Sequence, residues 1–221
     1  MKLQTRMSVL TLATCAAVLL LVSGAMAAPS FVNNSFEVDA TTGFQSVDPT
    51  GWTTFRVGAP PYLINNNTYG NTPYGSQFLA LGGIEDNAAS WIEQTVSGFN
   101  VNQTYTLSWA QSSEYTSSDE LQVSFTAGSN TAGQIFTSVP YPGGGQFWFT
   151  WQNFSMSFVP SATSVTFHFQ GVPNLTPPSY EVGVDNFQIS GGTNTPEPGT
   201  LIMMGSGVLG FAGMLRRKIK V

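Results

Sequence analysis

The chain has 221 residues and few charged side chains, and its formal net charge is −5. This length fits one domain together with targeting segments. Residues 28–195 hold eleven acidic residues and one basic residue, Arg56, which gives them a net charge of −10. Nucleic-acid binding is excluded, because it requires a positive surface that displaces counterions from phosphates. The single cysteine, Cys15, precedes this part, so disulfides and thiol chemistry are excluded from it as well.

The first 27 residues are organised like a secretory signal peptide. Lys2 and Arg6 give a positive start, residues 9–22 are apolar, and Ala25-Met26-Ala27 supplies the small residues that signal peptidase accepts. We therefore predict an exported protein whose signal helix is removed. Two alternatives stay open, a retained anchor helix and a lipoprotein signal that uses Cys15.

The part between the targeting segments has the periodicity of an all-β domain. Apolar and polar side chains alternate with a period of two, and no stretch sustains a period of 3.6 residues. The clearest expected strands are 104–109, 121–125, 154–158, 165–169 and 182–189. Weaker strands are expected at 31–36, 52–57, 77–81 and 91–96. Half-buried strands of this kind predict an antiparallel two-sheet sandwich with an apolar face inward on each sheet.

The strand landmarks resemble those of the galactose-binding-like jelly rolls of carbohydrate-binding modules. In chain order they are Asn33-Asn34-Ser35-Phe36-Glu37, Gly51-Trp52, Gln94-Thr95-Val96 to Trp109, Trp151-Gln152-Asn153-Phe154 and Val184-Asp185-Asn186-Phe187. The resemblance covers most of residues 31–190. It implies an all-β jelly-roll sandwich over residues 28–190, flanked by the signal helix and a short C-terminal hydrophobic helix.

The same resemblance implies one structural calcium ion held by Glu37 and Asp185. Carboxylates at these two positions commonly help to hold calcium in such modules. Asn33 or Asn34 and nearby carbonyl groups can complete a shell of about six to eight oxygens. A cation would also offset the net charge of −10. The alternative is that both carboxylates only accept hydrogen bonds at strand ends and hold no metal.

Aromatic residues in loop-like segments are the candidates for sugar contact, because pyranose CH faces stack on aromatic rings and binding residues concentrate in loops. The candidates are Tyr62, Tyr69, Tyr74, Tyr115, Trp148 and Tyr180. Asparagines 65–67, beside Tyr69, can hydrogen-bond sugar hydroxyls. Four other tryptophans are expected to pack inside the sandwich, namely Trp52, Trp91, Trp109 and Trp151.

No residue pattern marks a catalytic site, and we expect that the protein is not an enzyme. The only histidine, His168, falls on the side of its strand opposite Phe167 and Phe169, and nothing in the sequence orients it as a catalytic base. Glycoside hydrolysis needs two carboxylates about 5–10 Å apart. Adjacent acids such as Asp119 and Glu120 point to opposite faces of a strand and do not make such a pair alone.

The end of the chain resembles the PEP-CTERM sorting signal of proteins that exosortases process in Gram-negative bacteria. A short linker at 191–195 precedes it, and the signal itself covers 196–221. The resemblance rests on Pro196, Glu197 and Pro198, the apolar run 201–215, and the basic residues Arg216 and Arg217. As a helix this apolar run spans about 22 Å, short of the ~30 Å bilayer core. We therefore expect a temporary inner-membrane tether with its basic end in the cytoplasm; an ordinary single-span anchor is the alternative.

Together these features predict an exported, non-catalytic sandwich that binds polysaccharide. Its partners would be an exosortase-type protease and, transiently, the inner membrane. Its final place would be the cell surface or extracellular matrix of a Gram-negative bacterium. Two alternatives stay open, a purely structural matrix or surface protein and a small carbohydrate-active enzyme.

Overall fold

The structure is a computed structural model, and it describes only part of the chain. The described residues are 27–39, 41–55, 61–65, 69–82, 90–114, 116, 118–143, 148–172, 181–192 and 206–207. Residues 28–193 form one compact unit, and residues 1–27 with 194–221 form another. The predicted signal helix and the sorting segment therefore lie almost wholly outside the described residues. Within the described part of the chain, no helix is long and apolar enough to cross a membrane.

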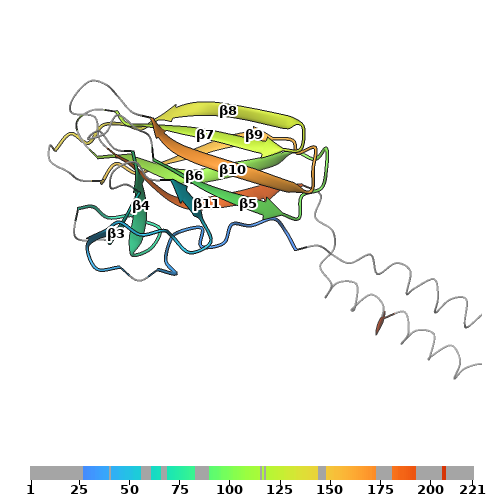
Figure 1. The fold of residues 1–221 in the computed structure, drawn as a ribbon, viewed down its shortest axis with the longest axis horizontal. Coiled ribbons are helices and arrows are strands. Elements are labelled where there is room, and N and C mark those ends of the chain that lie inside the picture. Colours follow the sequence, from blue (N-terminus) through green and yellow to red (C-terminus); the bar gives the residue numbers. More distant parts are fainter. Residues whose placement is uncertain are drawn as a thin grey trace, which may run out of the picture. The chain divides into compact units, whose positions relative to one another are not determined.

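Residues 28–193, which we call the sandwich domain, fold into two antiparallel sheets, and these confirm the predicted all-β sandwich (Figure 1). One sheet has the order β1-β3-β4-β11-β6-β9, formed by Phe44–Gln45, Tyr62–Asn65, Gln77–Leu81, Val182–Gly191, Tyr105–Ser113 and Gln152–Phe158. The other has the order β2-β5-β10-β7-β8, formed by Thr53–Phe55, Trp91–Ser97, Ser164–Val172, Glu120–Ala127 and Asn130–Thr137. We call them the six-stranded and the five-stranded sheet.

The core lies between the sheets and is built from the inward side chains of the alternating strands. In β10, Val165, Phe167 and Phe169 are buried, whereas the residues between them are partly exposed. Phe169 contacts Phe187 of the opposite sheet, with 4.4 Å between ring centroids. Each buried aromatic ring removes a large apolar area from water. Aromatic packing thus supplies the cohesion of a domain that contains no cysteine. Because the core draws its members from within the unit, the sandwich domain is expected to fold by itself.

One predicted strand is wrong. Residues 31–36 form turns, and Asn33 and Phe36 have positive φ angles of 52° and 58°, which do not occur in regular strands. Phe31 and Phe36 are nevertheless buried in the core. The apolar residues of this segment therefore contact the core although the segment is not a strand. The other predicted strands are present with slightly different ends, and β1, β3 and β8 were not predicted.

Glutamine side chains attach this N-terminal segment, residues 31–39, to the sheets. The amide of Gln94 in β5 donates to the carbonyl oxygen of Val32 (3.1 Å) and accepts from its N–H (2.7 Å). The amide of Gln77 in β4 donates to the carbonyl oxygen of Phe36. Backbone polar groups need partners when they are buried. Here side-chain amides supply the partners that a neighbouring strand would otherwise provide.

Candidate functional site

The outer face of the five-stranded sheet carries aromatic and polar side chains. In β5, Ile92 and Val96 point into the core and are buried, whereas Trp91, Glu93 and Thr95 point outward and are partly or fully exposed. The expectation that Trp91 packs inside the sandwich is therefore wrong. The period-two alternation of 91–96 contained the correct signal, because it places Trp91 with Glu93 and not with Ile92.

Strand register brings the outward side chains into rows that cross the sheet. The first row consists of Phe55, Trp91, Gln170, Gln122 and Ile135. The rings of Phe55 and Trp91 are stacked, with 5.5 Å between centroids and 11° between planes, and Phe55 is 45% exposed. At about 4.8 Å per strand the row extends about 19 Å. It joins a stacked aromatic pair to two amide side chains in one line, which we call the aromatic row.

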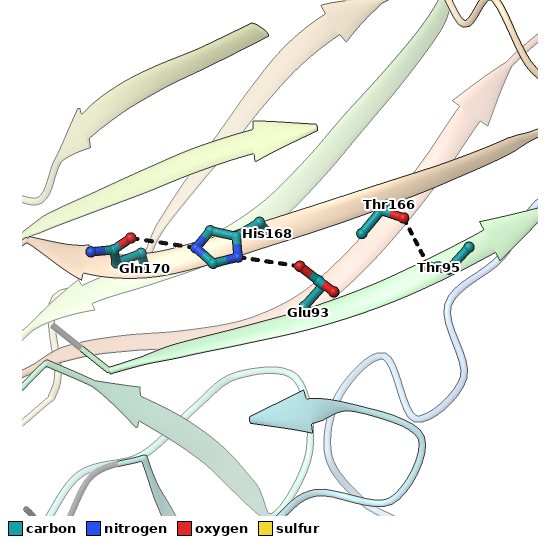
Figure 2. A network of polar contacts seen from close by, with 5 residues as sticks. All are labelled: Glu93, Thr95, Thr166, His168 and Gln170. Carbon is teal, nitrogen blue, oxygen red and sulfur yellow. Dashed lines mark hydrogen bonds and ion pairs between the residues drawn. The ribbon is translucent and has the colours of Figure 1, made fainter. Parts of the chain in front are cut away.

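The neighbouring row carries a carboxylate and the only histidine (Figure 2). His168 Nδ1 lies 3.5 Å from Glu93 Oε2, and its Nε2 lies 3.3 Å from Gln170 Oε1. The imidazole also contacts the ring of Trp91, with 4.8 Å between centroids. His168 lies opposite Phe167 and Phe169, as the alternation predicted. His168 therefore contacts Glu93 in its own row and both Trp91 and Gln170 in the aromatic row.

The next row is made of hydroxyl groups. It consists of Thr95, Thr166, Thr126 and Thr131 on four adjacent strands. Thr95 Oγ1 lies 2.8 Å from Thr166 Oγ1, so these two hydroxyls hydrogen-bond each other (Figure 2). Each hydroxyl can donate one hydrogen bond and accept others. The face therefore offers ring surfaces, amides, a carboxylate and hydroxyls, which together suit a ligand with many hydroxyl groups and some apolar CH surface.

The two residues predicted to hold calcium are joined by one loop. Thr72 Oγ1 donates to Asp185 Oδ2, while the N–H groups of Ser76 and Gln77 donate to Glu37 Oε1 at 2.8 and 3.0 Å. Asp185 is fully buried. Burial raises the pKa of Asp185 from 3.8 to about 7, and the negative charge of Glu37 raises it too, against the hydrogen bond from Thr72.

The ligand atoms around Glu37 and Asp185 are of the kind that a hard cation binds. Glu37, Asp185 and Thr72 present oxygen atoms, which are the ligands that calcium prefers. The described residues include no Lys or Arg that offsets the two carboxylates. No group of three acidic, histidine or cysteine residues in the described ranges can hold a metal ion. Carbonyl and hydroxyl oxygens would therefore have to supply most of the coordination shell.

Trp148, predicted to contact sugar, is buried. It lies on the outer face of the six-stranded sheet, 1% exposed, in a small second core with Ile64 and Phe78. Its Nε1 donates to the carbonyl oxygen of Glu181 (2.9 Å). Gly183 makes room for the indole, because a Cβ there would lie 2.7 Å from Trp148 Cδ1. The prediction for Trp148 is wrong, since apolar contacts with the sheet enclose a ring that a sugar would have to reach.

The other predicted aromatics differ in their surroundings. Tyr62 and Tyr69 both contact Phe44, with 4.0 and 5.6 Å between ring centroids, and Tyr69 is 37% exposed. Tyr74 donates its hydroxyl to an asparagine of β9. Tyr115 and Tyr180 lie outside the described residues. Sugar contact at these five tyrosines stays a prediction. Tyr62, Tyr69 and Tyr74 contact residues of the six-stranded sheet and do not share the face that carries Trp91.

Comparisons with known proteins match both parts of the chain. Residues 194–218 match the PEP-CTERM protein-sorting motif. No curated protein matches the chain. Among solved structures, TmCBM61 in complex with β-1,4-galactotriose is similar at a TM-score of 0.52 and 11% identity, covering 75% of this chain and 100% of that chain. Arabinose-bound MgGH51 α-L-arabinofuranosidase is similar at a TM-score of 0.52 and 13% identity, covering 79% of this chain and 28% of that chain.

At such low identities the structural likeness shows the fold alone. The sorting motif marks an exported protein whose membrane-anchored precursor is processed by exosortase and sorted to the cell surface. The chain therefore carries a PEP-CTERM protein-sorting motif, and its sandwich domain has the jelly-roll fold of carbohydrate-binding modules.

Proposed function

We propose that the sandwich domain binds a neutral polysaccharide across the outer face of the five-stranded sheet and catalyses no reaction. The aromatic row carries this proposal. Trp91 and Phe55 offer stacked ring surface at one end, and Gln170 and Gln122 continue the row with amides. An amide both donates and accepts hydrogen bonds, as sugar hydroxyls do. A chain of sugars lying along the row would meet both kinds of contact.

The negative charge of the sandwich domain favours a neutral ligand over an acidic one. Residues 28–195 carry a net charge of −10, and Glu93 lies on the proposed binding face itself. The described residues include no Lys or Arg that attracts uronate or sulfate groups. Like charges in an interface are unfavourable and suppress the wrong partners. A polysaccharide without charged groups meets none of this repulsion.

The setting that we propose is the cell surface or extracellular matrix of a Gram-negative bacterium that makes exopolysaccharide. The sorting motif at 194–218 supports display outside the cell. The fold supports binding, because TmCBM61 of the same fold is in complex with β-1,4-galactotriose. A domain displayed in this way would attach polysaccharide to the protein's own surroundings.

Affinity electrophoresis of the sandwich domain in gels with neutral polysaccharides (galactan, xylan, β-glucan) and acidic ones (alginate, polygalacturonate) tests the proposal. We expect retention by at least one neutral polymer. Trp91→Ala should weaken it at least tenfold, which corresponds to about 1.4 kcal/mol. Tyr69→Ala, which removes an exposed loop ring that contacts Phe44 of the six-stranded sheet, is the matched control and should bind like the wild type.

Three results would contradict the proposal. One is the absence of retention in every gel. Another is loss of binding in Tyr69→Ala together with full binding in Trp91→Ala, which would move the site to the loop aromatics. The third is release of reducing sugar from a retained polymer, which would make the domain an enzyme.

We also propose that one structural calcium ion binds at Glu37 and Asp185. The two carboxylates, which no Lys or Arg of the described residues offsets, and the buried position of Asp185 support it. Calcium should raise the Tm of the sandwich domain by several degrees over the value in chelator, because a ligand that binds only the folded state stabilises it. Asp185→Asn should abolish this rise. An equal Tm with calcium and with chelator in the wild type would remove the metal from the proposal.

A further inference from the structure

Strand β8, residues Asn130–Thr137, is an exposed edge of the five-stranded sheet (Figure 1). All its residues except Phe136 are exposed. The exposed residues include Ala132 and Gln134, whose side chains point toward the six-stranded sheet. Strand β8 therefore projects beyond the cover of the second sheet, and both of its faces meet solvent along most of its length.

The turn between β7 and β8 fixes which backbone groups of β8 face outward. Ala127 pairs with Asn130 across a two-residue turn, and residues that close such a hairpin exchange both of their hydrogen bonds. The β8 residues that bond to β7 are therefore Asn130, Ala132, Gln134 and Phe136. The N–H and C=O groups of Thr131, Gly133 and Ile135 point away from β7. Among the described residues, these groups have no hydrogen-bond partner.

This edge lacks the features that usually prevent strands from pairing between molecules. Natural edge strands are commonly very short, or carry Lys, Pro, a bulge or an inward-pointing charge. Strand β8 has eight residues, none of them charged or proline, and its register with β7 is unbroken. By contrast, β2 at the other edge of the same sheet has three residues. The exposed backbone groups of β8 are thus available to a partner strand.

We propose that β8 pairs antiparallel with β8 of a second copy of this chain, across a two-fold axis at Gly133. In this register Thr131 lies opposite Ile135 of the second copy, and the reverse holds at the other end. The outward groups of Thr131, Gly133 and Ile135 then form about six hydrogen bonds between the copies. Thr131 and Ile135 are both β-branched and pair well across strands. Gly133 at the axis adds no side chain where the two copies of the strand cross the axis.

The charge distribution favours this edge as the place where two acidic domains meet. The sandwich domain repels its own copies through its net charge, but β8 itself is uncharged. The neighbouring acid is Glu120, which accepts a hydrogen bond from Thr137 (3.3 Å). The two-fold axis places the Thr137 residues of the two copies eight residues apart along the paired strands, about 27 Å. This is well beyond the screening length of about 8 Å at physiological salt.

A disulfide trap tests the register. In the proposed dimer Ala132 faces Gln134 of the second copy in a non-hydrogen-bonded pair, with about 4.5 Å between Cα atoms, a distance that a disulfide spans. The sandwich domain has no other cysteine. Ala132→Cys mixed with Gln134→Cys should form a covalent heterodimer under mild oxidation. Ala132→Cys mixed with Asn130→Cys is the matched control, because those two positions are about 14 Å apart along the strands.

Sedimentation equilibrium without cysteines measures the same contact. Thr131→Pro removes an outward N–H and leaves every bond to β7 in place, so self-association should weaken at least tenfold while the far-UV spectrum and urea midpoint stay close to wild type. Three results would overturn the proposal. They are equal cross-linking in both mixtures, a monomer at all concentrations together with no cross-linking, and a dimer that Thr131→Pro leaves intact. The last result would assign the contact to another edge, such as β9. None of these outcomes depends on polysaccharide binding.

Discussion

Asp185 gives the sandwich domain a stability that falls as the pH rises. Its pKa in the folded domain is about 7, raised first by burial and also by the charge of Glu37. A carboxyl with a higher pKa in the folded than in the unfolded state binds its proton more tightly when folded. The contribution of Asp185 to the free energy of unfolding therefore decreases as the pH rises through the window between about 4 and 7. Above that window this contribution is constant.

The size of the effect follows from the shift. A rise from 3.8 to about 7, at about 1.36 kcal/mol per unit, amounts to about 4 kcal/mol lost between pH 4 and 7. Glu114 has a pKa raised from 4.5 to about 7 by burial; this adds about 3 kcal/mol in the same window. Both side chains are buried, so solvent screening does little to reduce these values.

Urea unfolding followed by tryptophan fluorescence, in chelator at pH 4.5, 5.5, 6.5 and 7.5, measures this dependence. Asp185→Asn should remove roughly half of the slope, because the amide has no proton to lose while its oxygen still accepts a hydrogen bond. Glu114→Gln should remove the other half. If calcium binds as proposed, saturating calcium should also suppress the share of Asp185. A wild-type domain that gains stability from pH 5 to 7, or an Asp185→Asn variant with the wild-type slope, would refute the reasoning.

Three further outcomes are expected. Trp148→Ala should destabilise the domain by about 4 kcal/mol in urea unfolding, because it empties the small second core; a loss below about 1 kcal/mol would contradict its structural role. Gln111→Leu should lower the free energy of unfolding by about 3 kcal/mol in the same assay. The buried Gln111 accepts from Trp109 Nε1 (3.1 Å) and donates to the carbonyl oxygen of Phe136 and the hydroxyl of Ser138, and leucine leaves these groups without a partner. An unchanged urea midpoint would show that these groups find other partners. Replacing Pro196 and Glu197 together by alanine within the sorting motif should leave unprocessed precursor in the membrane fraction, visible as a larger mass. Normal processing of this variant would show that the protease does not recognise these two residues.

The sequence was most informative where strands alternate cleanly. Strands β7, β9 and β10, and the first half of β6, bury one face in the core, and this produces the period-two pattern that predicts them. Strand β8 escaped prediction because it is an edge that buries only Phe136. Without one buried face there is no alternation to detect.

The candidate site was harder to predict than the fold. Residue type alone places Trp91 in the core, although the alternation of its strand places it on the outer face. The glycine-rich surroundings of Trp148 indicate a loop surface. No local pattern shows that the sheet has Gly183 at the position that accepts the indole. The rows of the outer face also depend on register between strands far apart in sequence, which a single sequence does not contain.

The attachment of residues 31–39 through the amides of Gln94 and Gln77 has a kinetic consequence. These amides are in position only after β5 and β4 have found their places in two different sheets. Attachment of this segment by the two amides therefore requires that both sheets have formed. Val32 is exposed, and its N–H is held by a side chain and not by a neighbouring strand. Native-state hydrogen exchange should therefore be faster at Val32 than in the central strands. Because Phe31 and Phe36 of the same segment are packed in the core, this opening is local to the backbone around Val32 and does not release the segment.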